Sequence, residues 1–244
     1  MCFSIEFLAR RTEKYNQRYK DILPPDFNQR LVGSELPLYY FVSGFSYPLL
    51  PLVTHSGIVM HQWGIIPFWI RDAEAARTIQ SKTLNAMGET VFKKPSFRSC
   101  IATKRGLLGV NGFYEWREVN KTKYPYLIKT LSMDIFSLGC IYESWVNRAT
   151  GEISNTFSIL TTPANALMAK IHNTKKRMPL IIAPQDEAKW IDTSLKRDQI
   201  KALIKPYDKN DMTAYTISSM ANKASANRNV PEIVHKLDYP ELTL

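Results

Sequence analysis

The sequence predicts an α+β fold, in which helices pack around a curved, largely antiparallel and barrel-like β-sheet. Two observations support this prediction. Four strand-like runs follow one another through the middle of the chain with short polar links, and helix-like segments lie before and after them. Short links favour antiparallel pairing, since a parallel connection needs a crossover of a dozen or more residues. No repeat, low-complexity segment or linker divides the chain, so we expect a single domain over residues 1–244.

The first part of the chain is predicted to hold one helix and one hairpin. After a short N-terminal strand, Leu8–Lys20 has the pattern of a charged helix, and Pro24–Pro51 is expected to form loops with short strands. Leu52–Ile66 is rich in β-branched and aromatic residues, in two runs that Ser56-Gly57 separates. That pattern is typical of a β-hairpin.

Strands fill the middle of the chain, and helices follow them. The four strand-like runs are Leu107–Trp116, Tyr124–Thr130, Ile135–Trp145 and Ile153–Leu160. Thr162-Pro163 is then predicted to open a helix that ends at His172, with proline at its first position. The remaining predicted elements are a strand at Pro179–Ala183, a helix opened by Pro184 and a helix at Asp198–Ile204.

Composition excludes several classes of protein. The hydrophobic share of 45% and the charged share of 22% are ordinary for a soluble globular protein. No apolar run approaches the roughly 20 residues of a membrane span, and the start of the chain lacks the pattern of a signal peptide. We therefore expect a cytoplasmic protein with no membrane partner. The cysteines Cys2, Cys100 and Cys140 form no CxxC pair, so we expect no disulfide, no metal and no cofactor.

The chain carries a net charge of +10, with a pI near 9.4. Such a charge is typical of a protein that meets phosphate groups. Aromatic residues lie between the basic clusters, and this favours a single-stranded nucleic acid, whose bases stack on rings. For any one basic cluster, a solvated surface is the alternative.

Cys2 follows Met1 directly, and we expect Met1 to be trimmed before so small a residue. Cys2 would then present an α-amine and a thiol two bonds apart, with ordinary pKa values of about 7.7–8.0 and about 8.5. Such a 1,2-aminothiol can add twice to one aldehyde and close a five-membered thiazolidine ring. The alternative is a small buried residue at the start of a chain.

Four segments carry a family resemblance. They are Met1-Cys2, residues 85–90 (NAMGET), residues 112–116 (GFYEW) and residues 171–179 (IHNTKKRMP). With Trp63-Gly64 and Ala164-Asn165 between them, their order and spacing resemble the SOS response-associated peptidase (SRAP) family, from Cys2 to about Trp190. The resemblance implies a protein that shields abasic sites in single-stranded DNA by forming a thiazolidine crosslink through Cys2. It also implies weak lyase chemistry, a peptidase or hydrolase label and a bacterial-type protein that joins the nucleoid when DNA is damaged.

The resemblance assigns catalytic positions to Cys2, Asn85, Glu115 and His172. Glu115 suits a general acid/base that opens the closed sugar, because burial beside Tyr114 and Trp116 would raise its pKa. His172 can donate to a phosphate or a sugar oxygen, and Asn85 can both donate and accept. Each residue also has a purely structural alternative. Glu115 could form a salt bridge on a strand, His172 could interact with the dipole at a helix end, and Asn85 could stabilise a turn.

DNA contacts are predicted at a further set of residues. Met87 stands where the family has an arginine that binds phosphate, and Arg98 or Lys82 is expected to supply that charge instead. The basic insert after His172 is expected to add phosphate contacts. The predicted DNA-binding residues are Trp63, Gly64, Lys82, Arg98, Lys175, Lys176 and Arg177.

Two other functions compete with abasic-site capture. Cys2 could serve an N-terminal-nucleophile amidase or peptidase, with His172 or its own amine as the base. The chain could also be a single-strand-binding module without covalent chemistry, which would not need Cys2. We expect a monomer in each case.

Overall fold

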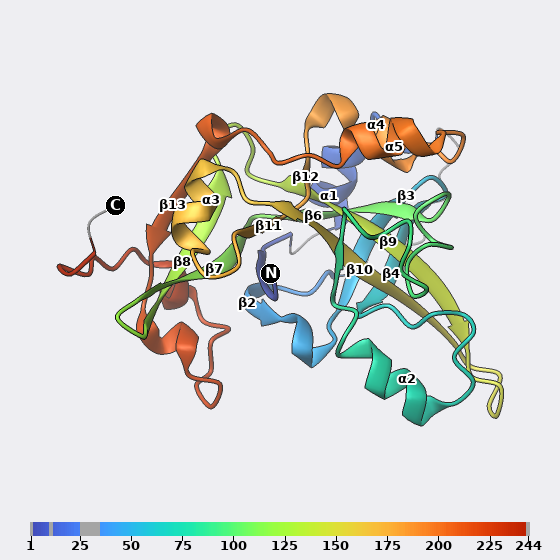
Figure 1. Ribbon diagram of the computed structural model, residues 1–244, viewed down its shortest axis with the longest axis horizontal. Coiled ribbons are helices and arrows are strands. Elements are labelled where there is room, and N and C mark those ends of the chain that lie inside the picture. The colour runs from blue at the N-terminus through green and yellow to red at the C-terminus, as the bar shows by residue number, and fades with distance from the viewer. Residues whose placement is uncertain (1, 10–11, 25–34, 243–244) are drawn as a thin grey trace.

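Two β-sheets form the framework of the protein, whose computed structural model describes residues 2–9, 12–24 and 35–242 (Figure 1). Five strands of the larger sheet pair in the cyclic order β10-β4-β3-β6-β9 and return to β10, so they close a barrel. All of these pairings are antiparallel except that of β4 with β10. The barrel strands are β3 (Leu49–Thr54), β4 (Gly57–Trp63), β6 (Arg105–Val110), β9 (Phe136–Val146) and β10 (Ile153–Pro163).

Three short strands extend the barrel. β5 (Asn85–Met87) runs parallel to β10, β11 (Arg177–Pro179) pairs with the end of β10, and β12 (Ile181–Ile182) pairs with β9. The predicted strand at Pro179–Ala183 is therefore split between two partners. The predicted hairpin at Leu52–Ile66 is present as β3 and β4.

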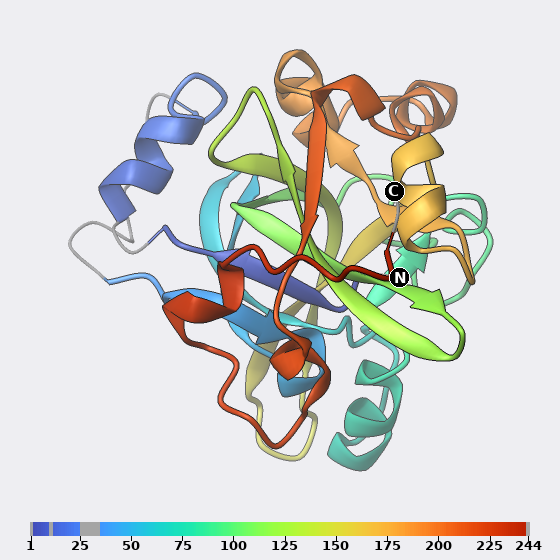
Figure 2. The same ribbon diagram turned by 90° about the vertical axis from the view of Figure 1, so that its left-hand side faces the viewer.

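The second sheet has the strand order β13-β8-β7-β1-β2 and is antiparallel throughout. In Figure 2 it faces the viewer, and the long β7–β8 hairpin crosses its middle. Its strands are β1 (Ser4–Phe7), β2 (Tyr39–Ser43), β7 (Gly112–Val119), β8 (Thr122–Thr130) and β13 (Met212–Thr216). The curved, largely antiparallel and barrel-like α+β fold that the sequence predicts is thus present.

The predicted order of strand pairing is wrong at one place. Leu107–Trp116 is two strands, because the chain leaves the barrel at Val110 and enters the second sheet at Gly112. Asn111 holds this crossing: its backbone N–H donates to the Glu6 carbonyl at 3.0 Å, and its Oδ1 accepts from the Leu8 N–H at 2.8 Å. As a result β6 pairs with β9, and the short link between β8 and β9 joins two different sheets.

Five α-helices lie in the described residues. They are α1 (Thr12–Tyr19), α2 (Ala73–Gln80), α3 (Ala166–Ile171), α4 (Pro184–Ile191) and α5 (Arg197–Leu203). Four 3₁₀ turns accompany them: η1 (Gly44–Ser46), η2 (Lys209–Asp211), η3 (Ser219–Asn222) and η4 (Pro231–Val234). Pro184 opens α4 as predicted, and α5 lies within a residue of its predicted bounds. Across the described residues, no helix is both long and apolar enough to cross a membrane.

Two predicted helix starts are wrong. α1 begins at Thr12 rather than Leu8, and Leu8 and Ala9 belong to neither a helix nor a strand. Thr162-Pro163 still belongs to β10, where Thr162 pairs with Met178 of β11. The cap of α3 is Asn165, whose Oδ1 accepts from the Met168 N–H at 2.9 Å. The helix nevertheless ends at His172 as predicted.

Candidate active site

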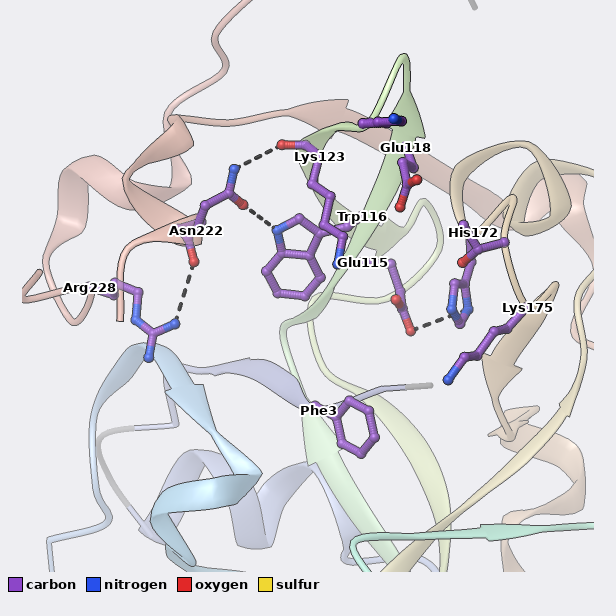
Figure 3. Close-up of a pocket in the computed structure, with 12 residues that line it drawn as sticks. Phe3, Glu115, Trp116, Glu118, Lys123, His172, Lys175, Asn222 and Arg228 are labelled. Atoms are coloured by element: carbon purple, nitrogen blue, oxygen red, sulfur yellow. Dashed lines mark hydrogen bonds and ion pairs between the residues drawn. The ribbon is translucent and has the colours of Figure 1, made fainter. Parts of the chain in front are cut away.

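A cavity of about 590 Å³ opens between the β7–β8 hairpin, the segment after α3 and the C-terminal segment (Figure 3). Residues of both charge signs and two aromatic rings surround it. Its lining consists of Phe3, Glu115, Trp116, Glu118, Lys121, Lys123, His172, Thr174, Lys175, Ala221, Asn222 and Arg228. Two of the four predicted catalytic residues, Glu115 and His172, thus face one hollow.

Glu115 lies on β7, opposite Tyr126 of β8, and only 3% of it is exposed. Burial in the sheet disfavours the charged carboxylate and raises the pKa of Glu115 to about 7. Its Oε1 lies 3.7 Å from His172 Nδ1 (Figure 3). Near neutral pH the carboxyl is therefore present in both protonation states, as proton transfer in either direction requires.

His172 is the C-cap of α3, and its backbone N–H donates to the Met168 carbonyl at 2.8 Å. Ring Nδ1 lies 2.9 Å from the Arg177 carbonyl oxygen. A carbonyl can only accept, so Nδ1 carries the proton and the neutral ring has its acceptor at Nε2. Burial lowers the pKa of His172, which favours this neutral form.

Cys2 precedes β1 and has no exposed surface. Its Sγ lies 3.8 Å from the Ser4 carbonyl oxygen. Burial raises the pKa of the thiol, and the negative charge of Glu115 raises it further. Cys2 is not among the residues that line the cavity.

Asn85 on β5 joins Cys2 to the barrel, because its Nδ2 donates to the Cys2 carbonyl at 2.8 Å. Its Oδ1 is buried and accepts no hydrogen bond from the described residues. Asn85 of β5 is thus bonded to Cys2, which precedes β1, and Glu115 of β7 lies beside His172, which caps α3. No group of three or more His, Cys, Asp or Glu side chains in the described part of the chain could hold a metal ion.

Trp63 and Gly64, both predicted to contact DNA, are packed inside the protein. The indole of Trp63 has no exposed surface, donates to the Leu84 carbonyl at 2.8 Å and stacks on Phe157. Gly64 has φ +103°, and a Cβ there would lie 2.6 Å from Gln80 Cγ. This burial argues against a DNA contact by Trp63. Both residues instead fix the segment that leads into Asn85.

The basic residues that were predicted to bind DNA differ in their positions and partners. Lys82 and Arg98 are exposed but do not line the cavity, whereas Lys175 lines it. Lys176 is exposed and has φ +49°. Arg177 forms an ion pair with Glu89, and its Nη2 also donates to Thr161 Oγ1 at 2.9 Å. A guanidinium with these partners is already occupied within the protein.

The insert after His172 is tied to the edge of β7. Asn173 Oδ1 accepts from the Glu118 backbone N–H at 3.0 Å, and its Nδ2 donates to the Glu118 carbonyl at 2.7 Å. These two bonds imitate a strand pairing. They hold the insert, and with it Lys175, beside the cavity.

Sequence reasoning missed the wall of the cavity farthest from His172. Trp116 Nε1 donates to Asn222 Oδ1 at 2.5 Å, and Asn222 Nδ2 donates to the Lys123 carbonyl at 2.8 Å (Figure 3). The Arg228 guanidinium lies 4.5 Å from the centre of the Phe41 ring. Trp116 follows Glu115 in the GFYEW segment, so the sequence could have predicted that it lies at the site. Asn222 and Arg228 lie outside helices of regular period, where no pattern marks them.

Known proteins resemble this chain along most of its length. The family model described as SOS response associated peptidase (SRAP) matches residues 5–224. The abasic site processing protein YoqW of Bacillus subtilis is 38% identical over 175 residues, which cover 71% of this chain and 74% of the relative. The abasic site processing protein HMCES of Xenopus tropicalis is 28% identical over 193 residues, covering 70% of this chain and 55% of the relative. The crystal structure of a protein from Bacteroides thetaiotaomicron has 37% identity and a TM-score of 0.86, and the match covers 97% of this chain and all of that one.

Proposed function

Because this chain belongs to the SOS response-associated peptidase family, we propose that it processes abasic sites in DNA by bonding the opened sugar to Cys2. One observation carries the proposal. Glu115 is a buried carboxyl with a pKa of about 7, it lines a cavity beside His172, and its charge raises the pKa of the Cys2 thiol. Capture of an abasic sugar needs a nucleophile together with a group that both gives and takes a proton.

Opening of the sugar is the first step. An abasic deoxyribose is mostly a closed hemiacetal, so its anomeric hydroxyl must lose a proton while its ring oxygen gains one. Glu115 can perform both transfers, because its pKa of about 7 leaves each protonation state populated near neutrality. His172 supplies a neutral imidazole at 3.7 Å, which can accept a hydrogen bond from a sugar hydroxyl through Nε2.

Bond formation follows, and it requires that Met1 has been removed. The freed α-amine of Cys2 adds to the aldehyde carbon, and the carbonyl oxygen leaves as water to give an imine. The thiol sulfur then adds to the imine carbon, and the thiol proton passes to nitrogen. The product is a thiazolidine, and the sum of both steps is the loss of one water. Asn85, which holds the Cys2 carbonyl at 2.8 Å, orients this nucleophile.

The rest of the cavity suits a single strand. A sugar is small beside a hollow of about 590 Å³, so room remains for neighbouring groups of the strand. Lys121, Lys123 and Arg228 line the cavity together with the half-buried indole of Trp116. Cations beside an aromatic face are the combination that binds phosphates and unpaired bases without regard to sequence.

The amidase alternative finds less support in the geometry. An acyl-transfer thiol needs a base within hydrogen-bond reach. Within the described residues, the hydrogen-bond partner of Cys2 Sγ is the Ser4 carbonyl and not His172, so only the α-amine of Cys2 is left as the base of such an enzyme. A module that binds single strands without covalent chemistry would need neither the bond from Asn85 to Cys2 nor the raised pKa of Glu115.

The test is the intact mass of the protein after incubation with a single-stranded oligonucleotide that carries one abasic site. We expect the mass of the chain without Met1 plus the oligonucleotide minus one water, and the adduct should survive denaturation. A tetrahydrofuran analogue of the abasic site, which cannot open to an aldehyde, is the control and should bind without an adduct. A product that appears only after borohydride reduction would show an imine without ring closure and would contradict the thiazolidine.

A further inference from the structure

A second cavity, of about 300 Å³, lies beside Gly88, the residue that follows Met87. Its floor is made by a close approach of α5 to the end of β5. A Cβ at Gly88 would lie 2.4 Å from Ile204 Cγ2, and the Gly88 N–H donates to the Thr161 carbonyl at 2.9 Å. Only glycine allows this contact, so the hollow is part of the packing of the fold.

An arginine and an aromatic ring are stacked in this cavity. The Arg197 guanidinium lies 5.0 Å from the centre of the Phe92 ring, and both residues line the hollow. The ring holds the guanidinium plane in a fixed place while its N–H groups stay exposed. A stacked platform of this kind suits a base or a phosphate.

The charges of the cavity are unequally compensated. Glu89 is paired with Arg177, whose hydrogen bond lowers the pKa of Glu89, and Lys201 is paired with Asp198 at 3.0 Å. Lys93 and Arg197 line the same hollow and form no ion pair with any described residue. Two positive charges thus face the cavity without a negative partner.

Arg177 connects this cavity to the active site. Its carbonyl oxygen binds His172, which lines the larger cavity, and its guanidinium binds Glu89, which lines the smaller one. A strand whose abasic sugar lies at Glu115 can therefore continue past Arg177 into the second hollow.

We propose that the cavity at Phe92 and Arg197 binds the single DNA strand beyond the abasic nucleotide, with Lys93 and Arg197 on its phosphates. This inference rests on the proposed function, because it needs a strand anchored at Cys2.

The experiment compares two oligonucleotides with one abasic site each. The long one carries single-stranded flanks on both sides, and the short one ends one nucleotide from the lesion on either side. For the long oligonucleotide, the observed binding constant Kobs of the double variant Lys93→Gln/Arg197→Gln should depend less steeply on salt than that of wild type. The magnitude of the slope of log Kobs against log salt should fall by about 1.4, at about 0.7 per lost contact. For the short oligonucleotide the slope should stay that of wild type, as should the adduct rate at saturating DNA on both.

A matched control removes two exposed charges elsewhere, through Lys20→Gln/Arg148→Gln. If this control lowers the slope as much as the cavity variant, the effect is one of net charge and the inference fails. Equal slopes for wild type and the cavity variant on the long oligonucleotide would also overturn it. Failure of the proposed function is a separate result, because wild type would then form no adduct with either oligonucleotide.

Discussion

Two buried carboxylates of this protein each lie near a buried cysteine, but their surroundings differ. Glu143 on β9 is 1% exposed, forms an ion pair with Lys104 and accepts from Cys100 Sγ at 3.5 Å and from the Ser144 N–H at 3.1 Å. Glu115 on β7 is 3% exposed, lies near Cys2 and has a neutral histidine 3.7 Å away in place of a lysine.

The difference is that Glu143 has a lysine as its ion-pair partner, whereas Glu115 faces an open cavity. Glu143 pairs with Lys104 and accepts hydrogen bonds from Cys100 and Ser144, so the group serves the packing of the barrel. Glu115 beside neutral His172 keeps a raised pKa of about 7 and faces an open cavity. A carboxylate beside a thiol is therefore not by itself a catalytic site; a proton that can move is also required.

The largest expected contrast is between the two cysteines. Cys2→Ala should abolish the denaturation-resistant adduct with abasic single-stranded DNA and leave reversible binding nearly intact, because no sulfur remains to close the ring. Cys100→Ala should leave adduct yield unchanged and lower the free energy of unfolding by about 1 kcal/mol. Denaturing gels of both variants measure the yield. The Cys2 variant keeps an α-amine, so a borohydride-trapped imine in it is compatible with the mechanism, whereas an undiminished crosslink without borohydride is not.

The two glutamates should differ next. Glu115→Gln should slow adduct formation about 10²–10⁴-fold at saturating DNA, because the amide cannot transfer the proton that opens the sugar. Glu143→Gln should leave that rate unchanged and lower the free energy of unfolding by about 1–3 kcal/mol, because its hydrogen bonds to a charged group are lost. Time courses of covalent yield, with binding measured separately, test both. Equal rates for wild type and the Glu115 variant would leave Glu115 as an ordinary strand residue.

The pH dependence of stability sharpens the same comparison. The pKa of Glu115 is raised from 4.5 to about 7 in the folded chain, so between these values the folded state binds more protons than the unfolded state. Its contribution to stability therefore falls as pH rises through this window, by on the order of 3 kcal/mol in total. Above the window the contribution is constant. The difference in unfolding free energy between wild type and Glu115→Gln should change by this amount between pH 4.5 and pH 7.5. A difference that does not vary with pH would assign Glu115 an ordinary pKa.

Sequence reasoning succeeded where chemistry depends on residue type and order. The segments of Cys2, Asn85, Glu115 and His172 are far apart in the chain, yet the structure gathers them, and the expected rise in the Glu115 pKa is present. Their catalytic roles stay predictions, as do the single domain and the monomer. The fold class was predictable because short polar links join successive strands, as in the β3–β4, β7–β8 and β9–β10 hairpins.

Sequence reasoning failed where one local pattern fits two structures. The apolar run 107–116 looks like one strand, and only the side chain of Asn111, bonded to Leu8, shows that it changes sheets. A proline after threonine suits a helix start as well as the end of a strand, so Pro163 was misassigned. Trp63 was expected to contact DNA as part of the family motif, but its indole is buried and stacks on Phe157.

The smallest expected effect concerns the lysines beside the two sites. Lys175 lines the cavity, and no ion pair joins it to the described residues, whereas Lys104 is paired with Glu143. Lys175→Gln should lower the salt slope of single-strand binding by about 0.7, equally for all base sequences, and leave stability unchanged. Lys104→Gln should leave the slope unchanged and cost about 1–3 kcal/mol of stability, since a buried carboxylate loses its cation.

Arg177→Gln belongs with Lys104 in this comparison, although it lies in the same basic insert as Lys175. Its guanidinium is committed to Glu89 and Thr161, so its loss should destabilise the β10–β11 pairing more than it changes the salt slope. DNA titrations at several salt concentrations, together with urea unfolding of all three variants, distinguish the cation that binds phosphate from the two that are paired within the protein. If Lys175→Gln leaves the slope at its wild-type value, Lys175 belongs to a solvated surface and the phosphates at the active site are held by Lys121, Lys123 and Arg228 alone.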